Sequence, residues 1–154
     1  VTLTSEEERV LHDYLFSVEI WGLYELSFFS SCSPLLSVQL LTKYTREMLR
    51  KSDFLQGVGK NRNMMHTLLL NGFMACIEVD DFTNALYFKK QIEKNFFEEN
   101  ETYFRIVYLW AEGLLASKQG RTEEGQRKME DAVRIFEMIG CSKSADYYRN
   151  ATEC

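Results

Sequence analysis

The sequence contains very few of the residues that break helices: one proline and eight glycines in 154 residues. The stretches between them repeat apolar residues at helical rather than alternating spacing. It also lacks an apolar run of the roughly 20 residues that a bilayer crossing needs. Residues 1–5 show neither the basic nor the apolar part of a secretory signal. Together these absences predict a soluble, cytoplasmic, all-α chain.

Metal-binding and disulfide patterns are missing as well. The two histidines, His12 and His66, lie far apart, and neither has a second ligand at a spacing such as H-E-x-x-H. The cysteines are widely spread and form no C-x-x-C pair, which favours reduced thiols. They are Cys32, Cys76, Cys141 and Cys154. We therefore expect no metal, no cofactor and no disulfide framework.

The charge balance and the polar residues argue against two classes of function. The net charge is −5, so the chain lacks the basic surface that contact with many nucleic-acid phosphates requires. Acidic pairs such as Asp80-Asp81 fall in predicted turns, where nothing indicates the burial that acid–base catalysis needs. No Ser or Cys stands in a nucleophile motif. We expect a chain that is not an enzyme and does not itself bind DNA.

Apolar spacing and capping residues predict a series of helices. Ser5 is expected to cap the first helix, and a second should end before Pro34, with Ser33 capping a third that runs to about Lys51. A connector at 52–59, a turn at 80–81 and Gly120 separate the later helices, and Thr122 is expected to cap the seventh. The residues expected to face inward are Leu11, Tyr14, Leu15, Val18, Trp21, Tyr24, Phe28, Leu41, Tyr44, Met48, Leu69, Leu70, Phe73, Ile77, Ala85, Phe88, Ile92, Phe96, Val107, Trp110, Leu114, Met129, Ala132, Val133 and Phe136.

These helices form pairs that begin about every 41 residues, a period typical of stacked helical hairpins. The last pair comes close to a tetratricopeptide pattern, with Gly113, Gly120 and Ala132 at the small positions of that repeat. The middle pair matches less well, with Phe73 in place of the first glycine and Ala85 at its small position. We expect residues 1–154 to form one domain, a right-handed tetratricopeptide-like solenoid of about three hairpins with flanking helices. An unrelated helical bundle is the alternative.

Five segments, in order and spread over nearly the whole chain, resemble the Rgg (also MutR or GadR) regulators of Gram-positive bacteria. They are DYLFSVE at 13–19, WGLYEL at 21–26, KNR at 60–62, NALYF at 84–88 and IFEMIGC at 135–141. The resemblance implies a cytoplasmic homodimer whose N-terminal helix-turn-helix domain binds promoters, while the repeat domain binds a short peptide pheromone. Since the first residue is not Met and no helix-turn-helix is visible, we expect a fragment that reaches DNA only through the absent domain.

In a solenoid of hairpins the first helix of each pair lines the concave surface, so ligand contacts are expected there. Asn71 is a candidate because it follows three leucines and precedes Phe73, where an unsatisfied amide would be costly. An aromatic residue at helical spacing is more often a core residue than a ligand contact, and Asn71 could equally hold a structural hydrogen bond. The predicted contacts are Tyr24, Phe28, Ser31, Arg62, His66, Asn71, Met74, Trp110 and Leu114.

The end of a solenoid must cover its apolar surface, so we expect the last hairpin and tail to form the dimer interface. The predicted interface residues are Phe136, Ile139, Tyr147 and Tyr148. Two functions remain open at this point. One is an effector-sensing and dimerisation domain that controls promoter binding; the other is a constitutive scaffold that holds a protein partner without any switch.

Overall fold

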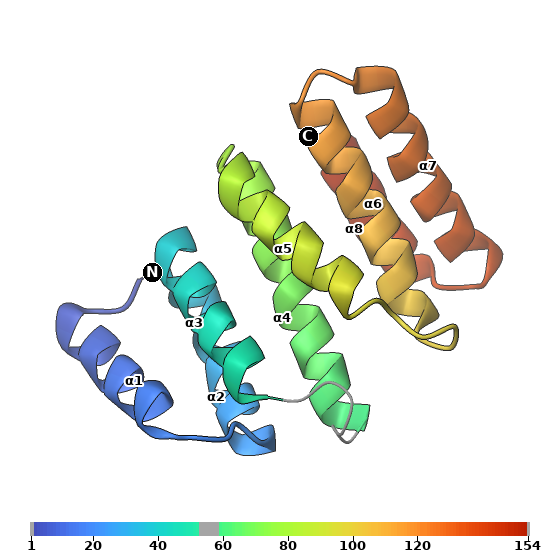
Figure 1. The fold of residues 1–154 in the computed structure, drawn as a ribbon. Helices are drawn as coiled ribbons and strands as arrows, with labels where there is room; N and C mark the ends of the chain where they lie inside the picture. The colour runs from blue at the N-terminus through green and yellow to red at the C-terminus, as the bar shows by residue number, and fades with distance from the viewer. Residues whose placement is uncertain (1, 53–58, 154) are drawn as a thin grey trace. The chain divides into compact units, whose positions relative to one another are not determined.

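The structure, a computed structural model, describes residues 2–52 and 59–153. Within these ranges every regular element is helical and none is a strand. The elements are α1 (Ser5–Ser17), α2 (Leu23–Cys32), a 3₁₀ turn η1 (Ser33–Leu35), α3 (Val38–Lys51), α4 (Gly59–Glu78), α5 (Phe82–Lys94), α6 (Thr102–Lys118), α7 (Thr122–Met138) and α8 (Ser142–Glu153). Figure 1 shows their order along the chain. The prediction of an all-helical chain is confirmed.

The chain divides into two compact units, residues 1–72 and residues 73–154, and the boundary falls inside α4. Each unit is described by itself below. None of the helices in the described ranges has the length and apolar character that crossing a membrane requires.

The first helix starts one residue earlier than predicted. Thr4, and not Ser5, is the N-cap: its hydroxyl accepts a bond from the Glu7 amide, while the Glu7 carboxylate accepts one from the Thr4 amide. This reciprocal pair is a capping box, which requires the acidic residue three positions after the cap. Leu11 and Leu15 are buried as predicted, whereas Tyr14 is half-buried and Val18 lies just beyond the helix end.

The second helix shows the largest error of the sequence prediction. Trp21 is buried but precedes α2, and the helix buries Leu26 and Phe29 in place of Tyr24 and Phe28. The reason is that α2 is apolar over most of its circumference, so spacing alone does not define its inner face. Pro34 lies in η1, and the N-cap of α3 is Ser37 rather than Ser33.

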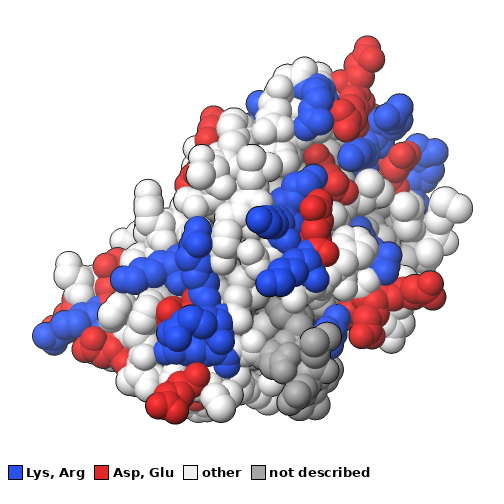
Figure 2. All heavy atoms as spheres, viewed as in Figure 1, with Lys and Arg blue, Asp and Glu red and all other residues white. Residues whose placement is uncertain are grey.

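After its start, which lies four residues later than predicted, the third helix agrees with the prediction. It ends at Lys51, buries Leu41, Tyr44 and Met48, and exposes the basic residues on its other side. Figure 2 shows Lys and Arg side chains gathered over this part of the molecule. The exposed basic residues of α3 are Lys43, Arg46 and Arg50. The connector was predicted at residues 52–59. Residues 53–58 lie outside the part of the chain that the structure describes, and Gly59 already belongs to α4.

The carboxyl end of α1 is tied to α3 by polar contacts. The Lys51 side chain is only 6% exposed. Its ammonium donates to the carbonyls of Phe16 (2.9 Å) and Leu15 (3.3 Å) and lies 3.2 Å from the Glu47 carboxylate. The Trp21 indole N–H also donates to the Leu15 carbonyl, at 3.1 Å. A cation at a helix carboxyl end satisfies carbonyls that have no partner within the helix and opposes the negative end of the dipole.

The second unit contains the most regular hairpin, α6 and α7, which cross at two glycines. A Cβ on Gly113 would lie 2.7 Å from the Gly125 carbonyl oxygen, and one on Gly125 would lie 2.7 Å from the Ser117 amide nitrogen. This confirms Gly113 as a contact residue, while Gly125 was missed. The buried predictions Ala85, Phe88, Ile92, Val107, Met129, Ala132, Val133 and Phe136 hold, but Leu114 is half-buried and Phe97 replaces the exposed Phe96 in the core.

Three helix ends share one turn geometry. Asp80, Gly120 and Gly140 all have positive φ, at 59°, 92° and 82°. In each case the amide of this residue bonds three residues back and the next amide bonds five residues back, which closes the helix. The predicted turns at 80–81 and at Gly120 are thus confirmed. Arg121, and not Thr122, is the N-cap of α7, with no side-chain cap bond.

Candidate ligand-binding residues

The predicted contacts on α2 form an aromatic surface with α1. Tyr24 is exposed and Phe28 half-buried, and the Tyr14 ring meets both edge-on, at centroid distances of 6.3 Å and 5.2 Å. The Tyr14 hydroxyl donates to the Glu25 carboxylate at 3.3 Å. Ser31 is exposed, and its hydroxyl bonds to the carbonyl one turn earlier. Tyr24 is 72% exposed, so this surface has apolar area left for a ligand.

On α4 the structure brings two predicted residues together. The Arg62 guanidinium lies 3.2 Å from the Nε2 atom of His66, one helical turn away. Because the guanidinium group can only donate, Nε2 is the acceptor in this contact. His66 is buried and Arg62 half-buried. The pair holds the guanidinium in a defined place at the helix surface.

Asn71 was selected because its amide was expected to lie among apolar side chains, and this expectation is wrong. Its side chain is exposed, although Leu68, Leu69 and Leu70 before it are buried. The desolvation argument therefore does not apply, because the position faces solvent on a helix whose other side is apolar. Met74, which lies in the second unit, is half-buried. Both side chains have surface that a ligand could contact.

Trp110 on α6 is part of the core of the second unit. Its ring lies 5.1 Å from that of Tyr148, and its indole N–H donates to the Thr152 hydroxyl at 2.9 Å. A buried indole needs such a partner for its N–H. The residue thus joins α6 to α8 and offers little surface of its own, whereas Leu114, one turn later, is half-buried.

The predicted interface residues fall into two groups. Phe136 and Tyr148 are buried within the chain and stack with centroids 5.7 Å apart. Ile139 and Tyr147 are exposed, at 58% and 68%. Sequence reasoning missed Met138, which is also strongly exposed beside them. The surface at the end of α7 and the start of α8 is therefore apolar and uncovered.

Several grooves lie within single units. One of about 540 Å³ runs between α1 and α2 and includes Phe28. In the second unit, a polar groove of about 400 Å³ follows α7 and α8, where Arg149 pairs with Glu137. A smaller one of about 320 Å³ is lined by Tyr103, Lys143, Ser144, Tyr147 and Tyr148. Among the residues that the structure describes, no three His, Cys, Asp or Glu side chains are grouped to hold a metal ion.

Sequence reasoning did not find the groove beside α1. Its apolar wall includes Val10, Leu11 and Cys32 in addition to Phe28. A signal was present, because Val10 and Tyr14 form a second apolar row beside Leu11 and Leu15. This row makes the apolar face of α1 wider than one neighbouring helix needs.

Solved structures give the same arrangement of helices. The SHP pheromone receptor Rgg2 of Streptococcus dysgalactiae is 29% identical, and its structure covers 97% of this chain with a TM-score of 0.88; 56% of the receptor chain is matched. A cysteine-to-serine variant of that receptor gives a TM-score of 0.89, again at 29% identity, covering 97% of this chain and 55% of the variant. A protein from Listeria monocytogenes EGD-e, at 20% identity, supports the fold alone, with a TM-score of 0.82 and coverage of 98% and 52%.

The chain thus spans about half the length of the structures that it matches. The match confirms the tetratricopeptide-like repeat fold expected from the helical periodicity. Over residues 1–150 the sequence also matches the family described as HTH-type transcriptional regulator Rgg, C-terminal domain. That family consists of regulators and not of enzymes, in agreement with the expected lack of catalytic function. The chain therefore belongs to the Rgg family, as a C-terminal domain of its helix-turn-helix regulators.

Proposed function

We propose that this chain is the effector-sensing and dimerisation domain of an Rgg-type regulator and that it binds a short peptide. The observation that carries the proposal is the likeness to the SHP pheromone receptor, at 29% identity over nearly the whole chain. In this proposal the peptide controls how a helix-turn-helix domain elsewhere in the protein binds promoters. The whole regulator acts in the cytoplasm as a homodimer.

The exposed and half-buried residues of the first helices are the proposed contacts. In the first unit these contacts combine the aromatic surface on α2 with two polar groups on α4. The polar groups are the Arg62 guanidinium, which lies against His66, and the Asn71 amide. An extended apolar peptide offers side chains to the rings, backbone groups to the amide and a carboxylate to the guanidinium. The proposed contacts in that unit are Tyr24, Phe28, Ser31, Arg62 and Asn71, and His66 positions Arg62.

In the second unit we propose that Met74 and Leu114 contact the peptide. Both are half-buried, and apolar side chains of this kind, the methionine especially, adapt to varied apolar partners. Trp110 supports the surface from within, because its indole bond to Thr152 holds α6 against α8. The proposal thus keeps all the residues predicted from the sequence but gives two of them, His66 and Trp110, a positioning role.

Titration calorimetry with the SHP pheromone of the Streptococcus dysgalactiae receptor, and with a synthetic library of short apolar peptides, tests the proposal. We expect at least one peptide to bind, and the variants Tyr24→Ala and Arg62→Met to weaken binding by roughly tenfold each. Leu86→Ala is the matched control, because Leu86 is exposed but lies on the second helix of its hairpin. No binding by any peptide, or equal losses in Leu86→Ala, would contradict the proposal.

The constitutive scaffold remains the alternative. A sensor changes promoter affinity only if the peptide binds the two states of the dimer with different affinity. Promoter binding by the full-length regulator, measured with and without the peptide found above, separates the two functions. A peptide that binds tightly but leaves promoter affinity unchanged would support the scaffold.

A further inference from the structure

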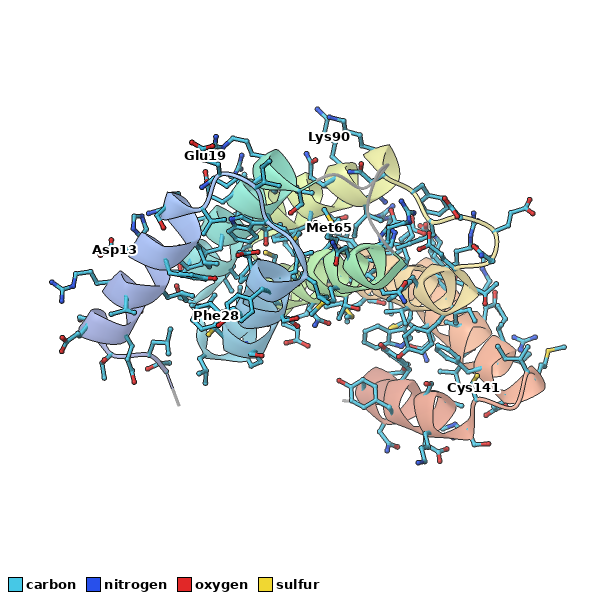
Figure 3. All side chains as sticks on the ribbon, turned by 90° about the horizontal axis from the view of Figure 1, so that it is seen from below. Asp13, Glu19, Phe28, Met65, Lys90 and Cys141 are labelled. Carbon is cyan, nitrogen blue, oxygen red and sulfur yellow. The ribbon has the colours of Figure 1, made fainter. Side chains whose placement is uncertain are left out.

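A row of uncharged polar residues runs along the exposed side of α4. We call it the polar row, and it consists of Asn63, Thr67 and Asn71, which follow one another at intervals of about one helical turn. The buried Met65, labelled in Figure 3, lies on the opposite side of the helix. Between residues 61 and 72 no other residue of α4 is exposed. The outermost groups of this stretch are therefore two amides and one hydroxyl.

The spacing of the polar row matches the repeat of an extended peptide. Residues four apart on an α-helix are separated by about 6.0 Å along its axis. Two residues of an extended chain advance by about 6.6 Å, and every second residue presents its N–H and C=O groups to the same edge. Over the whole row the two repeats differ by about 1.2 Å, which rotation of the asparagine side chains can absorb. An extended peptide can therefore lie along α4 with every second residue opposite a member of the row.

The three side chains supply the groups that a peptide backbone needs. Each asparagine amide contains a donor and an acceptor, so it can bond to both the N–H and the C=O of one peptide residue. The Thr67 hydroxyl donates to the Asn63 carbonyl at 2.8 Å, and its oxygen can still accept a bond from a peptide N–H. Since none of the three carries a charge, the row suits a neutral backbone better than a charged ligand.

The neighbouring helix α2 adds further uncharged groups beside the row. The Ser27 hydroxyl donates to the Met64 sulfur at 3.7 Å, which places α2 next to this part of α4. Ser31, one turn after Ser27, is exposed. Glu25, the one acidic residue of α2, is bonded to the Tyr14 hydroxyl. A peptide on the polar row therefore has hydroxyl and thioether groups beside it.

We propose that the polar row binds the main chain of an extended peptide over a stretch of about five residues. The first, third and fifth residues of this stretch bond to the row, and the two residues between them do not. Asn63 and Thr67 thereby join Asn71 as contacts, although the sequence pattern selected only Asn71. The inference rests on the proposed function and specifies which part of the ligand these side chains recognise.

Methylation of the peptide backbone tests this proposal by calorimetry. The probe is the SHP pheromone of the Streptococcus dysgalactiae receptor, or the tightest-binding library peptide if the pheromone does not bind, with one N-methyl group moved from residue to residue. We expect methylation at every second residue of one stretch to weaken binding roughly tenfold, because each methyl group removes one N–H donor, and methylation between them to change little. Equal losses along the peptide would overturn this proposal and leave the sensing function standing, whereas no binding by any peptide would overturn both.

Variants of the row show whether its side chains cause the pattern. Asn63→Ala and Asn71→Ala should each weaken binding of the unmodified peptide roughly tenfold, and each should abolish the methylation penalty at one peptide residue, a different one in each variant. Because both side chains are exposed, the thermal midpoint should change by less than about 2 °C. Asn150→Ala, at an exposed asparagine of α8, is the matched control and should bind like the unchanged chain. A methylation pattern that persists unchanged in both variants would overturn the proposal.

Discussion

The close backbone approach of α6 and α7 depends on two residues without side chains. Gly113 and Gly125 let α6 and α7 touch, and a Cβ at either position would meet backbone atoms of the other helix in addition to side-chain atoms. Backbone of this kind cannot move aside without separating the two helices. These two glycines therefore determine how closely α6 and α7 pack in the hairpin that positions Trp110 and Leu114.

We expect Gly125→Ala to lower the free energy of unfolding by about 2 kcal/mol, because overpacking outweighs the helix propensity that alanine adds. Urea unfolding followed by circular dichroism measures the change. Gly22→Ala is the control, since the nearest atom to its Cβ, in the Glu25 carboxylate, is 3.8 Å away and its φ is negative. A stable Gly125→Ala variant would show that α6 and α7 do not cross as described.

Tyr148 should make stability sensitive to alkali. Burial, with the nearby Tyr103 and Tyr147, raises its pKa well above that of free tyrosine. The folded state therefore retains the proton when the unfolded chain loses it, and the stabilising contribution present below pH 10 declines as the pH rises further. Burial and the nearby Glu112 and Glu93 raise the pKa of Tyr108 in the same direction.

We expect Tyr148→Phe to reduce the loss of unfolding free energy above pH 10 by up to about 1.4 kcal/mol per pH unit. Urea midpoints between pH 8 and pH 11.5 measure this slope. Tyr147→Phe, at the exposed neighbouring ring, should leave the slope unchanged. If both variants behave alike, Tyr148 is not buried in the manner described.

At the scale of the element, α1 is held by a polar attachment to α3 at one end and borders an open groove at the other. The attachment is the Lys51 ammonium, which bonds to two carbonyls in the last turn of α1 and is almost fully enclosed. Hydrogen bonds to a buried charge are worth more than exposed ones. Lys51 should therefore control how readily α1 opens.

We expect Lys51→Met to lower the unfolding free energy by about 2 kcal/mol and to raise amide exchange in the last turn of α1 first. Hydrogen exchange resolved by peptide measures both effects. Lys43→Met serves as the control: its ammonium also lies over the Phe16 ring, at 5.3 Å, but the side chain is exposed. Equal protection of α1 in the two variants would argue against the attachment.

The elements differ in how well the sequence predicts them, for a physical reason. The helices α3 and α7 have one apolar and one charged face, so spacing identifies their buried residues, such as Met48 and Phe136. For α2, which has apolar residues on most sides, spacing selected Tyr24 and Phe28 although Leu26 and Phe29 are buried. The sequence did not predict the exposure of Asn71, because residues adjacent in sequence point to different sides of a helix and their burial does not extend to Asn71.

At the scale of the whole molecule, the exposed apolar residues at the junction of α7 and α8 favour association. Ile139, Tyr147 and Met138 lie uncovered there, although Phe136 and Tyr148 already fill the interior beneath. We expect the chain to be a dimer at tens of micromolar and the double variant Ile139→Glu, Tyr147→Glu to be a monomer. Sedimentation velocity measures this. Leu86→Glu should remain a dimer, and a clean monomer for the unchanged chain would refute the interface.

The turn shared by Asp80, Gly120 and Gly140 has a consequence for how the molecule can be rebuilt. Three helices end in the same backbone geometry, with the same pair of closing bonds, although one of the three turns uses a residue other than glycine. The ends of these helices therefore have the same backbone geometry, and one could replace another. A segment cut after Asp80 and after Gly120 carries α5 and α6, so this pair could be duplicated in tandem, lengthening the array by two helices without a new connection.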